Sequence, residues 1–581
     1  MSVSIGSKYP GEREGQSPSS LPDPGLRPEG QSPSPLSEPG PRPEGQSPSS
    51  LPALGLSLRG LSVTLGGSAV LQEISLDLAA GEILALTGES GSGKSMTALA
   101  IMGLLPEGAA TRGDITLGDT RLDTLTDPQM CGLRGRRLGM VFQEPMTALD
   151  PVMTIGAQVM ETILIHRALP RAEARIRAAE TLARVGLPPD QVPPTRYPHE
   201  LSGGQRQRVV IAMAIALRPQ ILIADEPTTA LDVTTQAQIL DLLTDLVRQE
   251  GMGLLLVTHD LAVVAGRADR LAVMQAGRIV EEGPAADLLA APRHAYTRAL
   301  IAAARHQPVL PPRDPGGPLL QVSGLRRHHA LPRAHPFAKR RLFHAVQGVD
   351  LQIRQGERVA LVGASGCGKS TLARALLGLD AVQGGTITLA GHPVLAGRRA
   401  DPDQRRRLQA VFQDPYGSFN PRHSVGRLIA EPFHLLPDPP QGAARDAAVA
   451  EALRAVGLSP DHARSPIHAF SGGQRQRIAI ARALIIRPDM VIFDEAVSAL
   501  DVRVRAQILD LIADLSRSHG LAWLFISHDL SVVRGIADRV LVMEAGRIVE
   551  EGAPARIFDA PQHPATRALL AAAPHLPDPV G

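Results

Sequence analysis

The chain has 581 residues, of which 44% are hydrophobic and 20% charged, so it can build ordinary globular cores. Its 60 basic and 58 acidic residues leave a net charge of +2, which gives no overall attraction to nucleic acid or to an acidic surface. Cys131 and Cys367 are its two cysteines and lie far apart in sequence. They exclude a disulfide framework, and they exclude a structural four-thiolate metal site or iron–sulfur cluster.

The most apolar runs are too short to cross a membrane. The run Val209–Leu217 has about half of the ~20 residues that a membrane-spanning helix needs. The first residues, MSVSIGSKYPGEREG, lack the apolar core of a signal peptide. We therefore expect a cytoplasmic protein unless a partner holds it elsewhere.

Residues 1–53 are rich in proline and serine and contain a 15-residue repeat. The unit begins as EGQSPSSLPDPGLRP at Glu14 and returns at Glu29 and Glu44. Such a segment has little to bury, and we predict that it is disordered. We favour a repeat expansion, or a start site placed too far upstream, over a proline-rich docking arm.

The remainder of the chain is a tandem duplication. LSGGQRQR at Leu201 returns as FSGGQRQR at Phe470. At the same spacing, ADEPTTALDV returns as FDEAVSALDV and GRIVEEG returns unchanged. A proline-rich stretch joins the two copies. We divide the chain into a tail (1–53), a first copy (54–306), a linker (307–317), a second copy (318–574) and a C-terminal tail (575–581).

The sequence pattern of each copy predicts strands, a glycine loop and helices in the same order. EILALTG and RVALVG are short apolar runs that end in glycine and precede helical sequences, and ILIAD and MVIFD predict further buried strands. RAEARIRAAETLARVG predicts a helix with an apolar stripe at Ile176, Ala179, Leu182 and Val185, closed by Gly186. We expect an α/β fold with a helical insert in each copy.

The glycine loops are predicted phosphate sites. The pattern GxxxxGK[ST] spans Gly88–Ser95 and Gly363–Ser370, each between a strand and a helix. Glycines let backbone N–H groups point at phosphate oxygens, and the helix adds the positive end of its dipole. The lysine is expected on the β- and γ-phosphates of ATP and the serine on Mg²⁺. The predicted cofactor-binding residues are Gly88, Glu89, Ser90, Gly91, Ser92, Gly93, Lys94, Ser95, Gly363, Ala364, Ser365, Gly366, Cys367, Gly368, Lys369 and Ser370.

Three further side chains in each copy are candidates at these sites. Asp225 and Asp494 end apolar strands, where a carboxylate can hold the Mg²⁺ shell. Glu226 and Glu495 follow directly and are predicted to orient or deprotonate an attacking water; a capping or salt-bridged surface acid is the alternative. His259 and His528, in VTHD and ISHD, are candidates for contact with the γ-phosphate, although a lone histidine at a strand end is more often structural.

The motif LSGGQ, with the two phosphate motifs and the T/S-H-D turns, resembles the nucleotide-binding subunits of ABC transporters over about 520 residues. The resemblance implies two P-loop NTPase domains of the ABC type, each with a helical subdomain. It also implies that the domains pair head to tail, so that Lys94 faces Ser471 and Lys369 faces Ser202. By the same resemblance Gln143 and Gln413 match the Q-loop, which is catalytic, touches Mg²⁺ and precedes the segment that meets the membrane subunit. The implied signature residues are Ser202, Gly203, Gly204, Gln205, Ser471, Gly472, Gly473 and Gln474.

The sequences of two kinds of segment are similar to those of the oligopeptide, dipeptide and nickel importer branch of that family. These are FQ[ED]PxxxxxP after each Q-loop and HAYTRAL from His294, echoed by HPATRALL from His563. The fused arrangement resembles the glutathione and microcin importer ATPases. It implies two integral-membrane permease subunits, an extracytoplasmic solute-binding protein, no nucleic acid partner, and a peripheral place on the cytoplasmic face of the inner membrane.

The chain departs from the family pattern in three respects. The position of the adenine-stacking aromatic falls on Leu65 in the first copy, and Phe343 is the candidate in the second. Ala496 replaces proline in the DEP motif, although both carboxylates remain. The cysteine cluster that some relatives carry near the C-terminus is missing. Neither phosphate site lacks a motif residue, so we predict two hydrolytic sites.

Two functions of another class compete with transport. Some ABC proteins with two such domains act on ribosomes without a membrane partner, but they join their domains by a long charged helical linker. ABC-type DNA-repair ATPases bring zinc-binding cysteines, which two lone cysteines cannot supply. We therefore favour an import motor over a soluble ATPase acting on ribosomes or nucleic acid. The cargo is not encoded in these domains.

Overall fold

The computed structural model describes residues 55–143, 145–229, 231–310, 313–331, 340–395, 401–414, 417–498 and 500–577. The predicted tail 1–53 lies outside these residues, as do positions 311–312 of the predicted linker and positions 578–581 of the C-terminal tail. Within the described ranges, none of the helices combines the length and the apolar character that a membrane crossing requires.

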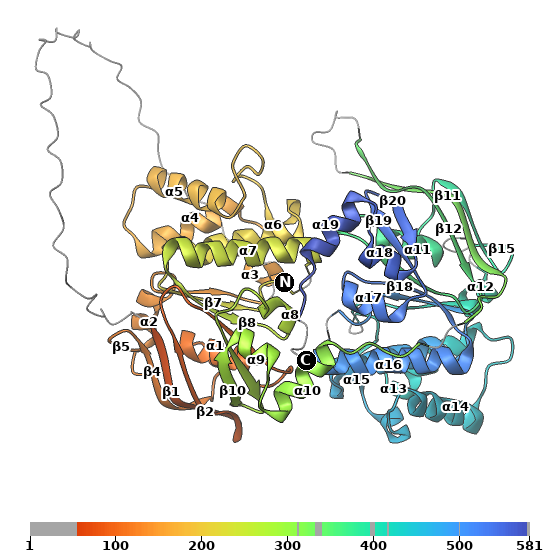
Figure 1. Cartoon of the computed structure of the whole chain (residues 1–581), viewed down its shortest axis with the longest axis horizontal. Coiled ribbons are helices and arrows are strands. Elements are labelled where there is room, and N and C mark those ends of the chain that lie inside the picture. The colour runs from red at the N-terminus through yellow and green to blue at the C-terminus, as the bar shows by residue number, and fades with distance from the viewer. Residues whose placement is uncertain are drawn as a thin grey trace, which may run out of the picture. The chain divides into compact units, whose positions relative to one another are not determined.

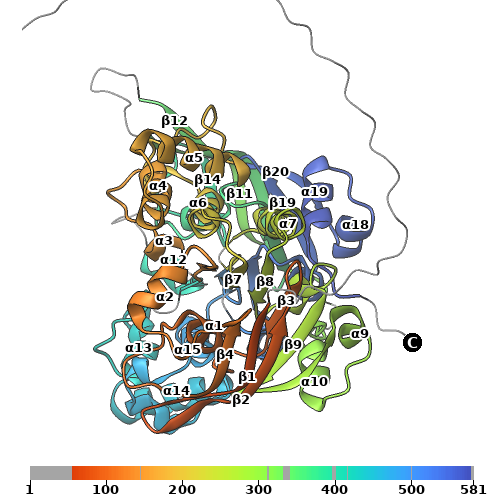
Figure 2. The same ribbon diagram turned by 90° about the vertical axis from the view of Figure 1, so that its left-hand side faces the viewer.

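The first copy contains two sheets. The smaller, antiparallel sheet has the order β2-β1-β4-β5, and Figure 2 shows β4, β1 and β2 side by side. The larger sheet has the order β10-β9-β3-β8-β7-β6 and is parallel except for the pair of β9 with β10. The strands are β1 (Leu56–Leu65), β2 (Ser68–Leu78), β3 (Ile83–Thr87), β4 (Ala110–Leu117), β5 (Thr120–Arg121), β6 (Leu138–Val141), β7 (Ile221–Asp225), β8 (Gly253–Val257), β9 (Arg270–Gln275) and β10 (Arg278–Pro284).

The helices of the first copy include the predicted insert, in which α4, α5 and α6 pack on one another (Figure 1). The helix predicted from residues 171 onward is confirmed, but its predicted apolar stripe is wrong at Ile176, whose side chain is 59% exposed. The buried face instead contains Ala174, Ala178 and Leu182. These residues are four positions apart and therefore lie on one side of the helix. The helices are α1 (Lys94–Met102), α2 (Asp127–Leu133), α3 (Pro145–Ala148), α4 (Ile155–His166), α5 (Arg171–Arg184), α6 (Gly203–Ile215), α7 (Val233–Glu250), α8 (Leu261–Val264), α9 (Ala285–Ala290) and α10 (Ala295–Ala304).

The second copy repeats this plan. Its antiparallel sheet has the order β12-β11-β14-β15, and its larger sheet has the order β16-β17-β18-β13-β19-β20. The strands are β11 (Pro318–Ala330), β12 (Leu342–Arg354), β13 (Arg358–Val362), β14 (Gly384–Leu389), β15 (His392–Pro393), β16 (Leu408–Val411), β17 (Met490–Asp494), β18 (Ala522–Ile526), β19 (Arg539–Glu544) and β20 (Arg547–Gly552). The helices are α11 (Lys369–Leu376), α12 (Pro402–Arg407), α13 (Val425–Ile429), α14 (Gly442–Ala455), α15 (Gly472–Leu484), α16 (Val502–His519), α17 (Leu530–Ile536), α18 (Pro554–Asp559) and α19 (Pro564–Ala572).

The central strands of each larger sheet position the candidate site residues. Every residue of β3, β7, β13 and β17 is buried, as continuous apolar runs in parallel strands should be. Because neighbouring parallel strands end at the same edge of a sheet, the glycine loop after β3, the acids that end β7 and the histidine turn after β8 converge there. The second copy brings β13, β17 and β18 together in the same way.

Candidate active site

The first glycine loop closes around the ammonium group of Lys94. The Nζ atom of Lys94 donates to the carbonyl oxygens of Gly88 at 2.8 Å and Glu89 at 2.9 Å. Gly88 has a φ of 151°, and a Cβ there would collide with the carbonyl oxygen of Met274, so only glycine fits. Burial lowers the pKa of Lys94, although Glu226 and Asp225 act against this effect.

The second glycine loop has the same construction. Lys369 donates to the carbonyl oxygens of Gly363 at 2.8 Å and Ala364 at 3.0 Å, and it begins α11 as Lys94 begins α1. Cys367 is buried at the position that Ser92 occupies in the first copy, and burial raises the pKa of its thiol. Both loops therefore place a compact cation at the start of a helix, an arrangement suited to phosphate.

The strand-end aspartates have the chemistry of a magnesium site. Asp225 is 5% exposed, and its Oδ1 atom has no hydrogen-bond partner among the described residues. In the second copy, Ser370 donates from Oγ to Oδ1 of Asp494 at 3.4 Å, and burial, with the nearby charge of Glu495, raises the pKa of Asp494 to about 6. A buried, under-coordinated carboxylate beside a serine hydroxyl fits the oxygen-preferring ion Mg²⁺, which would also offset the cost of this burial.

Glu226 is held by three side chains from different elements. Gln143 donates from Nε2 to its Oε2 atom at 2.8 Å, Thr229 donates to the same oxygen at 3.0 Å, and Nδ1 of His259 lies 2.9 Å from Oε1. Burial would raise the pKa of Glu226, but the hydrogen bond and charge of His259, with the bond from Thr229, hold that pKa below its usual range. The backbone of Glu226 is left-handed, with a φ of 47°, a conformation that residues other than glycine rarely adopt.

The corresponding group in the second copy is looser. Nδ1 of His528 lies 3.5 Å from Oε1 of Glu495, and Ser498 donates to the backbone oxygen of Glu495 instead of its carboxylate. Gln413 makes no hydrogen bond to Glu495 in the described part of the chain. The left-handed backbone is kept, with a φ of 51° at Glu495.

The two signature motifs begin long helices. Ser202 is the N-cap of α6 and accepts from the N–H of Gln205, and Ser471 caps α15 by the same bond to Gln474. Each glutamine side chain returns a bond to the serine N–H, which completes a capping box. The serines and glycines thus expose the positive end of a helix, which suits an anion.

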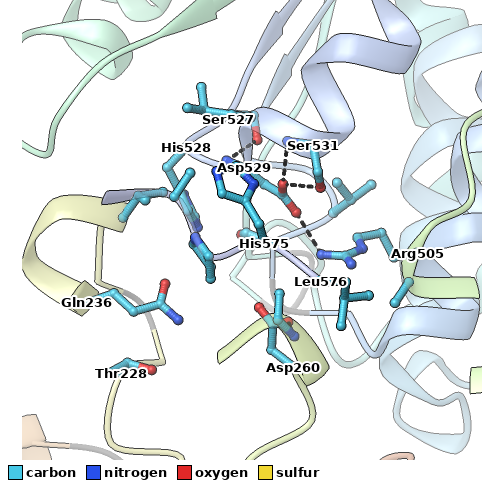
Figure 3. Close-up of a pocket in the computed structure, with 18 of the residues that line it drawn as sticks. Thr228, Gln236, Asp260, Arg505, Ser527, His528, Asp529, Ser531, His575 and Leu576 are labelled. Carbon is cyan, nitrogen blue, oxygen red and sulfur yellow. Dashed lines mark hydrogen bonds and ion pairs between the residues drawn. The ribbon is translucent and has the colours of Figure 1, made fainter. Parts of the chain in front are cut away.

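A cavity of about 550 Å³ lies between the histidine turns of the two copies. Its wall includes Thr228, Gln236 and Asp260 from the first copy, and Figure 3 shows them opposite Ser527, His528 and Asp529 from the second. In the second copy Arg505 binds Asp529 at 2.7 Å, and Ser531 donates to the same carboxylate (Figure 3). In the first copy Gln236 occupies the position that corresponds to Arg505. The two histidine turns are therefore held by different contacts.

Several functional contacts escaped sequence reasoning. The Thr229 contact to Glu226 lies inside a recognised motif, but the motif does not say which hydroxyl points at the acid. Arg503 and Arg505 stand where the first copy has Thr234 and Gln236, so a comparison of the two copies could have flagged them. The adenine-stacking candidate Phe343, 48% exposed on β12, remains a prediction, and Leu65, at the corresponding position of the first copy, ends β1.

The chain matches two protein families. The family described as ABC transporter matches residues 71–229 and 346–498, and the family described as oligopeptide/dipeptide transporter, C-terminal region, matches residues 280–341 and 549–580. The chain therefore belongs to the ABC transporter family, with two ATP-binding domains in one polypeptide, and its enzymatic activity is ATP hydrolysis. The second match adds the oligopeptide/dipeptide transporter C-terminal region to both copies.

Curated relatives match over nearly their whole length. The peptidoglycan transport ATP-binding protein YejF of Agrobacterium fabrum is 48% identical, with 89% of this chain and 96% of the relative covered. The glutathione import ATP-binding protein GsiA of Escherichia coli is 46% identical, with 87% and 86% covered. Among solved structures, cbiO1 from Clostridium perfringens is 27% identical and covers 42% of this chain and 92% of its own, with a TM-score of 0.36.

Proposed function

We propose that this protein is the ATP-hydrolysing motor subunit of an importer for peptides or related small solutes. The observation that carries the proposal is the clustering of Gln143, Thr229 and His259 around Glu226 beside the Lys94 loop. This group can hold a carboxylate ready to orient a water, which is what γ-phosphate hydrolysis requires. The names of the relatives, which cover glutathione import and peptidoglycan transport, favour peptide-like cargo.

Each site has an acid, a cation and a hydroxyl in defined roles. Lys94 and Lys369 neutralise the β- and γ-phosphates, and Ser95 with Asp225, or Ser370 with Asp494, holds Mg²⁺ with help from Gln143 or Gln413. Mg²⁺ supplies charge neutralisation at the phosphates. Glu226 and Glu495 orient the water, and His259 and His528 hold these carboxylates in place.

The two copies supply one another with signature motifs. Ser202 to Gln205 closes the site of Lys369, and Ser471 to Gln474 closes the site of Lys94. Two observations support this head-to-tail pairing. The charge of Asp501, from the second copy, acts to raise the pKa of Lys94. The charge of Asp232, from the first copy, acts to raise the pKa of Cys367. Helices α10 and α16 are in contact, as are α19 and α7, so each copy touches the other by the same elements.

The partners in this proposal are two membrane permease subunits and an extracytoplasmic solute-binding protein, with the chain on the cytoplasmic face of the inner membrane. The helical insert of the first copy offers a contact surface. Val152, Ile165 and Ile176 are large apolar side chains on or beside α4 and α5, exposed by 79%, 72% and 59%. Exposed apolar side chains gathered on one subdomain are typical of a protein interface.

A pull-down from native membranes in mild detergent tests the proposal. The tagged chain should bring down two multi-span proteins in equal amounts. The double variant Val152→Asp/Ile165→Glu should lose them, whereas Val309→Asp, at a residue 80% exposed within the linker, should keep them. Recovery of ribosomal proteins, or of a chain without any membrane partner, would contradict the importer and favour a soluble ATPase.

A further inference from the structure

The two copies differ at three positions that lie together at the first nucleotide site. Because the motifs align the copies, each residue has a defined counterpart in the other copy. At each of these three positions, the first site has a large polar side chain and the second site has a small residue. The first-site residues are Glu89, Tyr296 and Arg503, and their counterparts are Ala364, Ala565 and Thr234.

The first contact joins the two copies directly. Arg503, near the start of α16 in the second copy, donates from its guanidinium to Oε1 of Glu89 at 2.7 Å. Glu89 is the second residue of the Lys94 loop, and its carbonyl oxygen also binds Lys94. The ion pair therefore ties the backbone of the first phosphate loop to a helix of the other domain.

The second contact braces the same loop from its own domain. The backbone N–H of Glu89 donates to the hydroxyl oxygen of Tyr296 at 3.1 Å. Tyr296 is 6% exposed in α10 and packs in one apolar cluster with Leu300 and with Val502, the neighbour of Arg503 in the second copy. Glu89 is thus held on its backbone by one domain and on its side chain by the other.

The second site has the same backbone plan without these groups. Ala364 follows Gly363 in the phosphate loop, and Thr234 occupies the Arg503 position on α7. The methyl group of Ala364 can neither accept from Thr234 nor form an ion pair. Ala565 offers no hydroxyl to the loop, although α19 repeats the position of α10.

We propose that Glu89, Tyr296 and Arg503 form an interdomain latch that makes the two ATP sites unequal, because it holds the Lys94 site closed longer than the Lys369 site. Arg503 and Tyr296 act as positioning residues, since they act through Glu89 and not on the phosphates. The inference rests on the proposed head-to-tail sites and adds that nucleotide leaves the first site more slowly than the second.

Release of a fluorescent ATP analogue from single-site chains tests the latch. Glu226→Gln with Glu495→Gln blocks turnover, Lys369→Ala leaves the first site, and Lys94→Ala leaves the second. Arg503→Thr, which copies the second site, should speed release from the first site by roughly threefold, the effect of a partly exposed ion pair, and leave the second site unchanged. The difference should vanish at high salt because exposed ion pairs are screened.

Matched variants separate the latch from a general loss of packing. Arg503→Lys keeps the charge and should restore slow release, and Tyr296→Phe should speed release while keeping the ring buried. Arg517→Thr removes an arginine from the same helix whose ion pair is with Asp514 of that helix, and it should change neither rate. Equal acceleration at both sites, or no acceleration at low salt, would overturn the latch.

Transfer of the latch gives a second test. Ala364→Glu with Thr234→Arg and Ala565→Tyr should slow release from the second site, and each single substitution should have less effect. Unchanged release in the triple variant would overturn the assignment of the latch to these three side chains. If neither single-site chain retains the analogue, the proposed ATP sites are wrong and the latch falls with them, a result distinct from normal binding with equal release.

Discussion

Nδ1 of His259 lies 2.9 Å from Oε1 of Glu226, whereas the same atoms of His528 and Glu495 are 3.5 Å apart in the second copy. His259 counters the burial of Glu226 and keeps its pKa low, and the carboxylate in turn raises the pKa of His259 despite burial. The histidine therefore favours the charged form of the acid to which we assign the orientation of the water.

His259→Ala should move the acid limb of the ATPase pH profile to higher pH. Without the histidine, burial dominates and the pKa of Glu226 rises, so the carboxylate is protonated at a higher pH and activity is lost earlier as pH falls. The profile should be measured in a Glu495→Gln chain. His392→Ala, at an exposed residue of β15, is the control and should leave the limb in place. An unmoved limb in the His259 variant would contradict the assignment.

Removing both proposed water-orienting acids should separate ATP binding from turnover. Glu226→Gln with Glu495→Gln keeps the shape and loses the base, so turnover should fall by about 100-fold or more while ATP still binds. Glu107→Gln, at an exposed glutamate, serves as the matched control. Turnover near that of the unmodified chain in the double variant would place the base elsewhere.

Lys94→Arg should weaken ATP binding at the first site despite the conserved charge. The ammonium fits between the carbonyl oxygens of Gly88 and Glu89, and a planar guanidinium is too wide for that space. We expect a loss of about tenfold or more in affinity, measured by titration in a Lys369→Ala chain. Arg112→Lys, at an exposed site on β4, should bind normally. Normal binding by the Lys94 variant would show that charge alone suffices.

Magnesium-dependent ATP binding at the second site should weaken as pH falls through about 6. The pKa of Asp494 is raised to about 6, mainly by burial, so below that pH the carboxyl is protonated and cannot hold the ion; above it the carboxylate forms. Binding should be followed in a Lys94→Ala chain. ATP itself also titrates in this range, so the same binding should be measured in an Asp494→Asn variant. The pH dependence of binding that remains in this variant belongs to ATP. Identical profiles in the two chains would refute the prediction.

Trp523 should report the unfolding of the second copy alone. It is the single tryptophan of the chain, fully buried in β18, with its ring 6.3 Å from that of Phe493. Asp538→Ala leaves the buried guanidinium of Arg358 without this carboxylate, which costs roughly 3–5 kcal/mol. The tryptophan fluorescence transition should therefore move to lower denaturant. Asp77→Ala, in an exposed ion pair of the first copy, should not move it.

Much of the fold and the motif geometry could be predicted from the sequence because both are local. Apolar runs such as ILIAD define buried strands, and the spacing of Gly88 to Lys94 defines the loop that follows one. The helix at residues 171–184 was predicted, but the exposure of Ile176 was not, because the phase of an alanine-rich stripe is poorly defined by its apolar residues.

The contacts that distinguish the two sites could not be predicted in this way. Glu89 is 207 residues from Tyr296 and 414 from Arg503, and no spacing rule connects residues so far apart. Such contacts depend on how the sheet edges and helices of two domains meet. The substitution of all three residues in the other copy was visible in the sequence, but its meaning required their positions in space.

Counting the ATP molecules held by one chain tests the central claim most directly. The Glu226→Gln/Glu495→Gln protein should be incubated with ATP and Mg²⁺ and weighed intact by native mass spectrometry. If the two copies complete one another's sites, the main species will be a single chain carrying two ATP. A single chain that holds at most one ATP, or ATP retained only when two chains pair, would contradict the head-to-tail sites within one polypeptide.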